Sequence, residues 1–188
     1  MNERKSIFWI EALKGGTVIG LVSVAFSLAM QGTEGVSVLM TALNVFSAVV
    51  MAVLAFAFTR RLAAKSSDLE GFSVGRAVGF VTAMMAIAGV LSGIYTSIMA
   101  NFFIYDELME VVEVSMAQIQ DMIPAASFDR TYSLMRASVT NPLVLTLSSV
   151  IGNALLGVFG GLCVGLLTRR NPNIFAPVEE ENNNSQQE

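Results

Sequence analysis

Histidine is absent from this sequence, and ionisable side chains of every kind are scarce. Only 14% of its 188 residues are charged, whereas an ordinary soluble domain has about a quarter. Ser/His/Asp catalysis is excluded without histidine, and the single cysteine, Cys163, lies inside an apolar run. Neither a disulfide nor a His/Cys metal site can therefore be built within the chain. We expect no metal and no cofactor.

Motifs that carry enzyme chemistry are missing as well. The glycine-rich stretches lie within apolar runs and are not followed by the Lys-Ser/Thr pair of a phosphate-binding loop. A carboxylate pair could be drawn from Glu107, Glu110 and Glu113, but on an exposed helix face these residues are more simply a solvated charge run. The sequence predicts no catalytic residue. The net charge of −4, with acidic and basic residues in separate segments, also argues against a nucleic-acid surface.

Long uncharged runs make up most of what is present, and 54% of the residues are hydrophobic. Four runs are long enough to cross a bilayer as helices, at about 1.5 Å rise per residue. They cover residues 7–30, 36–58, 74–105 and 142–168, with Glu11 and Lys14 expected to snorkel at the edge of the first. The sequence thus predicts an all-α, polytopic transmembrane helical bundle in a single domain, residues 1–171.

Two further predictions concern the first apolar run and the last residues of the chain. The first run could instead be a cleaved signal peptide, since Arg4 and Lys5 precede it and Ser27-Leu28-Ala29 resembles a cleavage site. We favour a retained span, because charge is spread over its start and residues 31–35 are typical of a tight hairpin. Residues 172–188 have few apolar side chains to bury, which predicts a disordered tail.

The distribution of lysine and arginine predicts the orientation of the spans. Nine of the eleven basic residues flank one side of the predicted spans, and only Arg130 and Arg136 fall on the other. Because flanking cations are retained on the cytoplasmic side, we expect both termini to be cytoplasmic, in a bacterial inner membrane. Residues 106–139 would then be extracytoplasmic.

That external segment is amphipathic. At 100° per residue its apolar positions fall on one side of a helix, namely Leu108, Val112, Met116, Ile119 and Ile123. Its acidic positions fall on the other. The simpler interpretation is a solvated acidic face over a stripe that packs on the chain's own spans, and the alternative is that Glu107, Glu110, Glu113 and Asp121 form a docking surface for a partner or a cation. Pro124 should break this helix, and a second amphipathic stretch leads back to the fourth span. We therefore predict an external helical hairpin between spans three and four.

Small residues recur at four-residue spacing inside the spans, which allows helix backbones to approach closely. The candidate packing residues are Gly16, Gly20, Gly79, Gly89, Gly93, Ser97, Gly157, Gly161 and Gly165. These faces could pack within one chain, which is the simpler interpretation, or between two chains of a homodimer. Asn44 and Asn153 are strongly polar groups deep in their spans, and we expect each to make an interhelical hydrogen bond.

The arrangement resembles the bacterial four-span family known as domain of unknown function family 4199. The matching features are an aromatic-to-glycine entry at Trp9 to Gly20, the segment Gly71-Phe72-Ser73-Val74-Gly75-Arg76-Ala77-Val78-Gly79-Phe80, Tyr95, the acidic segment Asp106 to Asp121, and a glycine-rich last span ending in Arg169-Arg170. The proline usual after the turn at Tyr105-Asp106 is missing here. The resemblance implies a four-span inner-membrane protein and brings no known activity.

Two functions of different classes remain. The packing faces, the amphipathic external segment and the lack of ionisable residues inside the membrane favour a non-enzymatic scaffold or accessory subunit of a membrane assembly. The alternative is a small oligomeric transporter or channel in which Asn44, Asn101 and Asn153 line a path.

Overall fold

The computed structural model describes residues 2–31, 37–66, 71–120 and 124–171, and this part of the chain is helical throughout apart from its connections. Its helices are α1 (Asn2–Gln31), α2 (Ser37–Ala64), α3 (Val74–Phe102), α4 (Tyr105–Ile119), α5 (Ala125–Thr140) and α6 (Pro142–Thr168). Four of them, α1, α2, α3 and α6, are long and apolar enough to cross a membrane. The predicted all-α class with four candidate spans is confirmed. Residues 32–35 of the expected hairpin and the expected disordered tail lie outside the described residues.

Local side-chain chemistry determines where two of the spans begin. The Ser73 hydroxyl accepts a hydrogen bond from the backbone N–H of Arg76 at 3.3 Å, which satisfies a donor at the start of α3. The Asn141 side chain accepts from the N–H of Leu143 at 2.9 Å, and Pro142 occupies the first turn of α6, where its missing N–H costs nothing. A serine and an Asn-Pro pair at these positions are start signals that can be read in the sequence, and both act as caps in the structure.

Two span boundaries differ from the prediction. The second helix continues past residue 58 to Ala64, because Arg60 and Arg61 are good helix formers that can keep their charge in water. The third helix ends at Phe102 instead of 105. There, the backbone N–H groups of Phe103 and Ile104 both donate to the carbonyl of Met99, each at 3.0 Å, which closes the helix.

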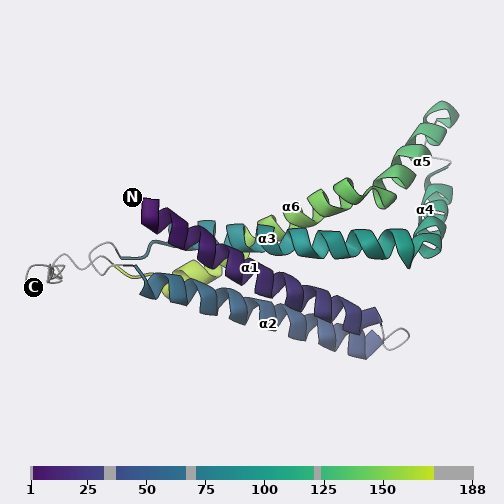
Figure 1. The fold of residues 1–188 in the computed structure, drawn as a ribbon. Helices are drawn as coiled ribbons and strands as arrows, with labels where there is room; N and C mark the ends of the chain where they lie inside the picture. The colour runs from purple at the N-terminus through teal and green to yellow at the C-terminus, as the bar shows by residue number, and fades with distance from the viewer. Residues whose placement is uncertain (1, 32–36, 67–70, 121–123, 172–188) are drawn as a thin grey trace, which may run out of the picture.

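Helix α3 lies at the centre of the bundle (Figure 1). Its most extensive contacts are with α6 along one side, followed by α1 on another. Helix α2 packs mainly on α1, and at the periphery its contacts with α3 and α6 are few. The consequence is a tightly packed α3–α6 pair to which α1 and then α2 are added.

The two ends of the bundle have different compositions. The start of α1, the end of α2, the start of α3 and the end of α6 gather at one end, whereas α4 and α5 project from the other (Figure 1). We call the first the basic end, and its cationic residues include Lys14, Arg60, Arg61, Lys65, Arg76, Arg169 and Arg170. Arg130 and Arg136 belong to α5, at the opposite end.

The buried core is concentrated toward the basic end. Phe72, Phe80 and Met84 are fully buried, and the ring of Phe8 packs edge-on against Phe80 at a centroid distance of 5.5 Å. Around this core, large apolar side chains face outward along every span, from Leu21 in α1 to Leu166 in α6. A surface so extensively apolar suits a hydrocarbon environment.

A backbone bridge joins the connection before α3 to the end of α6. Phe72 and Arg170 exchange two backbone hydrogen bonds, of 2.9 and 3.1 Å. Gly71, just before the bridge, has a φ of 62°, a left-handed conformation that glycine adopts without steric cost. The bridge therefore holds the residues that follow α6 against the start of α3.

The predicted apolar stripe of the acidic segment is present in α4. Val112 and Met116 are buried, and Leu108 and Ile119 are half-buried. Residue 123, the last predicted member, lies outside the described part of the chain. Pro124 precedes α5, as expected from its inability to continue a helix. The two helices contact each other and the ends of α3 and α6, so the stripe is covered by the chain's own helices.

Candidate functional site

Glycines of α6 allow α3 and α6 to approach closely along one half of their contact. A Cβ atom added at Gly157 would lie 2.8 Å from the Cα of Thr82, and one at Gly161 would lie 2.8 Å from the Cα of Val78. At Gly165 the nearest atom would be a methyl carbon of Val74, at 3.0 Å. Since real Cβ atoms essentially never come within 3.0 Å of another heavy atom, the two helices reach this separation at Gly157 and Gly161 only because these positions carry hydrogen, and Gly165 is a tight contact of the same kind.

Glycines of α3 allow the same close approach along the other half of the α3–α6 contact. A Cβ at Gly89 would lie 2.8 Å from the Cα of Val150, and one at Gly93 would lie 2.7 Å from the Cα of Thr146. The small residue is thus supplied by α6 near the basic end and by α3 toward the α4–α5 end. Ser97, the next predicted packing residue, is also buried. We call this contact the α3–α6 seam.

A second close contact joins α1 to α3. A Cβ at Gly16 would lie 2.6 Å from the carbonyl oxygen of Met84, and one at Gly20 would meet the side chain of Leu91 at 2.8 Å. Close backbone approach of this kind supplies dispersion contacts that lipid cannot match. Helix α3 is therefore held on two sides by small-residue contacts.

Gly79 is an exception among the predicted packing residues, and its assignment to a helix contact within the chain is wrong. It is exposed, and a Cβ added there would meet nothing within 4 Å. Val78, its neighbour, faces Gly161 in the seam, and the next residue of a helix is rotated by about 100°. Gly79 consequently points away from α6.

Three polar side chains meet in the middle of the seam. The Asn153 amide donates to the Ser92 hydroxyl at 3.4 Å, and the hydroxyls of Ser92 and Ser149 lie 3.3 Å apart. The same amide donates to the backbone carbonyl of Ser149 at 2.8 Å. Asn153 therefore makes the expected hydrogen bond between helices, and the serines that complete the cluster had not been singled out in the sequence.

Asn44 does not make the expected interhelical bond. Its amide donates to the carbonyl of Met40 in its own helix at 3.0 Å, and its side chain is exposed. It lines a groove of about 320 Å³ between α2, α3 and α6, together with Ser47, Met85 and Leu156. The prediction failed because α2 is peripheral and its Asn44 face has no helix packed closely against it.

Glu11 also differs from the prediction, which placed it at the membrane edge with its charge in water. It is only 6% exposed, and its carboxylate lies 2.6 Å from the ammonium of Lys65. Lys65 follows α2 and is half exposed, so the pair joins α1 to α2 at the basic end. A buried carboxylate is tolerable when a cation is bound to it, and the position of Glu11 in a charge-poor run was the signal for such a partner.

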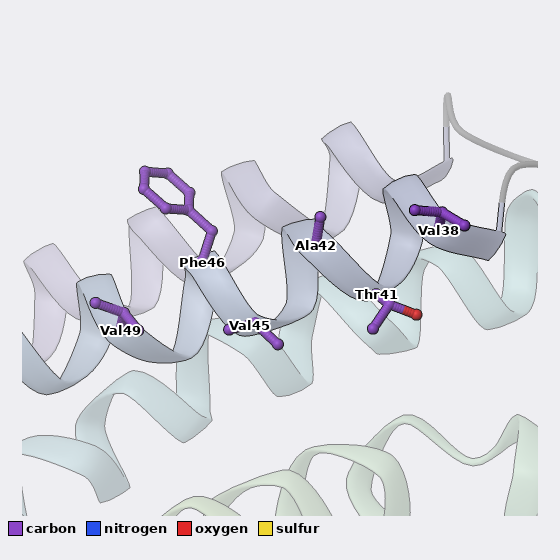
Figure 2. A pocket seen from close by; sticks show the side chains of 6 residues that line it. All are labelled: Val38, Thr41, Ala42, Val45, Phe46 and Val49. Carbon is purple, nitrogen blue, oxygen red and sulfur yellow. The ribbon is translucent and has the colours of Figure 1, made fainter.

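A wide apolar hollow of about 700 Å³ lies on α2, as Figure 2 shows. It is lined by Val38, Thr41, Ala42, Val45, Phe46 and Val49. Among these side chains the only oxygen is the Thr41 hydroxyl (Figure 2). Such a surface can contact acyl chains or another apolar helix, but it offers no group for chemistry.

The acidic face of α4 is exposed. Glu107, Glu110 and Glu113 all point away from the buried stripe, while position 121 lies outside the described residues. The nearby Arg136 donates to the Tyr105 hydroxyl at 3.3 Å, and this bond is the main cause that raises the pKa of Arg136. Within the described ranges, no group of His, Cys, Asp and Glu could hold a metal ion.

These features define the class of the protein and, with the comparisons, its family. Four apolar helices packed through small residues, with apolar side chains outside, are typical of a multi-pass membrane protein. Residues 14–170 match the family described as "Protein of unknown function (DUF4199)", and the chain belongs to this family. Searches of curated proteins and of solved structures returned no match.

Proposed function

We propose that this protein is a non-enzymatic scaffold or accessory subunit of a membrane assembly, located in a bacterial inner membrane. The observation that carries the proposal is the double packing of α3, through the seam with α6 and through Gly16 and Gly20 of α1. The ionisable Glu11 within the first candidate span is engaged with Lys65. A rigid helix core of this kind suits a protein that presents surfaces to partners.

The orientation follows from the charges. Apart from Arg130 and Arg136 of α5, the described cations lie at the basic end, whereas the α4–α5 end carries the acidic face. The positive-inside rule then places both termini in the cytoplasm and the α4–α5 hairpin outside. On this topology, Glu107, Glu110 and Glu113 would be the surface that meets an extracytoplasmic protein partner, and α2 would be the span most available to a second copy or another membrane protein.

A transporter or channel is the second candidate, and the groove lined by Asn44 and Ser47 is the observation that favours it. The hydrogen bonds weigh against it. The amides of Asn44, Asn101 and Asn153 each donate to a carbonyl four residues earlier in their own helix. Amides engaged in this way are less suited to replace the hydration shell of a passing solute.

Two measurements on the full chain separate these candidates. Purification from native membranes in mild detergent should recover a different protein at a fixed ratio, whereas an oligomeric transporter would retain only further copies of itself. Substituting Glu110 and Glu113 by Gln should weaken an external partner while leaving the fold intact. Proteoliposomes should show no flux of ions or small polar solutes above protein-free vesicles. Protein-dependent flux that is lost in Asn44→Leu would overturn the scaffold proposal.

A further inference from the structure

A groove of about 400 Å³ opens at the basic end, between the last turns of α2 and α6. Three arginines line it, Arg60 from α2 and Arg169 and Arg170 from the residues after α6. Phe56 and Leu167 form apolar walls on the side toward the spans. Cationic groups beside apolar side chains are the two parts that an amphiphilic anion requires.

The simplest function for these arginines would be to compensate the partial negative charge at the ends of two helices. Each helix C-terminus carries roughly half a negative charge, so α2 and α6 together account for about one unit, against the two guanidinium groups of Arg60 and Arg169 alone. The Glu11 carboxylate at this end is already bound to Lys65. Among these described groups, positive charge therefore exceeds negative charge at the groove.

The apolar side chains of the groove distinguish a phospholipid from a free phosphate as its ligand. Leu167 is 75% exposed and follows a run of span residues, so the groove lies where hydrocarbon gives way to headgroups. Arginine binds phosphate oxygens in bidentate fashion while its stem lies along apolar surface. A free phosphate would use the arginines and leave the apolar walls uncovered, whereas a phospholipid would use both.

We propose that this groove binds the phosphate of an anionic phospholipid, with an acyl chain along Phe56 and Leu167. Basic pockets between spans on the cytoplasmic side are suited to such headgroups. The backbone bridge to Phe72 holds Arg170 in position directly after α6, so the arginines that follow α6 reach the lipid from a fixed support. The proposal holds whether the protein is a scaffold or a transporter.

The test is lipid binding by the full chain in detergent, measured by native mass spectrometry with phosphatidylglycerol and phosphatidylcholine. The wild type should prefer phosphatidylglycerol by at least about tenfold. Each cation near the lipid is worth about a fivefold change, so Arg60→Gln combined with Arg169→Gln should weaken phosphatidylglycerol about 25-fold and leave phosphatidylcholine unchanged. Arg130→Gln, a matched loss of an exposed arginine at the other end, should change neither.

Several results would overturn the proposal. Equal binding of the two lipids by the wild type would do so without any variant, and so would unchanged phosphatidylglycerol binding in the Arg60/Arg169 double variant. Binding of inorganic phosphate is measured as well. If phosphate alone binds as tightly as phosphatidylglycerol and displaces it, the groove is a site for a soluble anion. Should the double Gln variant fail to fold, the charge-preserving pair Arg60→Lys and Arg169→Lys should bind phosphatidylglycerol with intermediate affinity.

Discussion

The α3–α6 seam and the outer face of α2 are both apolar, yet only the seam brings two backbones together. In the seam, a hydrogen atom at Gly161 or Gly93 allows close approach to the facing helix. On α2, Val45 and Phe46 are 60% and 59% exposed. Lipid is as apolar as these side chains, so hydrophobicity alone does not make helices associate in a membrane. The comparison shows that residue size, more than apolarity, determines which faces pack here.

The largest effect should come from enlarging a seam glycine. Gly161→Leu forces a side chain against the Cα of Val78, and overpacking typically costs about 1–3 kcal/mol. We expect thermal unfolding in detergent to occur several degrees lower than in the wild type.

Gly152, in the same helix, provides the matched control, because it is exposed and a Cβ there meets nothing within 4 Å. Gly152→Leu should change the melting temperature little, since it adds the same side chain to the same helix on an open face. Equal losses in the two variants would mean that leucine disturbs α6 wherever it is placed, and the comparison between seam and outer face would fail.

The next largest effect should come from the ion pair at the basic end. Lys65→Gln leaves the buried Glu11 carboxylate without its 2.6 Å partner. Because Lys65 is half exposed, we expect a cost of about 1–2 kcal/mol, below the 3–5 kcal/mol of a fully buried pair. Adding Glu11→Gln should restore part of the stability, and a double-mutant cycle measures this coupling. Strictly additive losses would show that the pair does not join α1 to α2.

A smaller effect should follow from the polar cluster in the seam. Asn153→Val removes the hydrogen bond to Ser92, and bonds of this kind between spans average about 0.6 kcal/mol. Asn44→Val is the control on α2, where the amide bonds only within its own helix, and it should cost less. Guanidinium or thermal unfolding in detergent can rank the two. A greater loss at Asn44 would indicate that its exposed face has a partner in the purified protein.

The smallest effect should come from neutralising the acidic face of α4. Glu110→Gln with Glu113→Gln removes repulsion worth about 0.2–0.5 kcal/mol, so the helix should become equally stable or slightly more so. Hydrogen exchange over residues 106–119 is the measurement. Loss of protection there would show that the charges, and not the buried Val112 and Met116, stabilise α4.

The sequence predicted the features that depend on neighbours along the chain. Apolar runs located the spans, and Ser73 and Asn141 marked helix starts, because a cap needs only the next three residues. Features that depend on which helix lies opposite were less accessible. Four-residue spacing correctly identified Gly161 as a packing residue, but it also selected Gly79, which faces no helix of the chain. Spacing alone does not show which side of a helix is turned toward its neighbour.

Contacts between distant segments were the least predictable. The pairing of Glu11 with Lys65 and the bridge between Phe72 and Arg170 each join residues more than fifty positions apart. The arginine groove likewise combines α2 with the residues after α6. Charge patterning placed these cations on one side of the membrane, but only the fold shows that three of them share one groove.

Disulfide trapping tests the seam within one chain most directly. The hydroxyls of Ser92 and Ser149 lie 3.3 Å apart, so Ser92→Cys with Ser149→Cys, combined with Cys163→Ser, should form a bridge on mild oxidation in native membranes. Ser92→Cys with Ser148→Cys, one residue out of register, is the control and should react slowly. We predict a cross-link within the monomer, visible as a shift in gel mobility without a dimer band. A dimer-sized product, or no cross-link at all, would contradict the seam between α3 and α6 of the same chain.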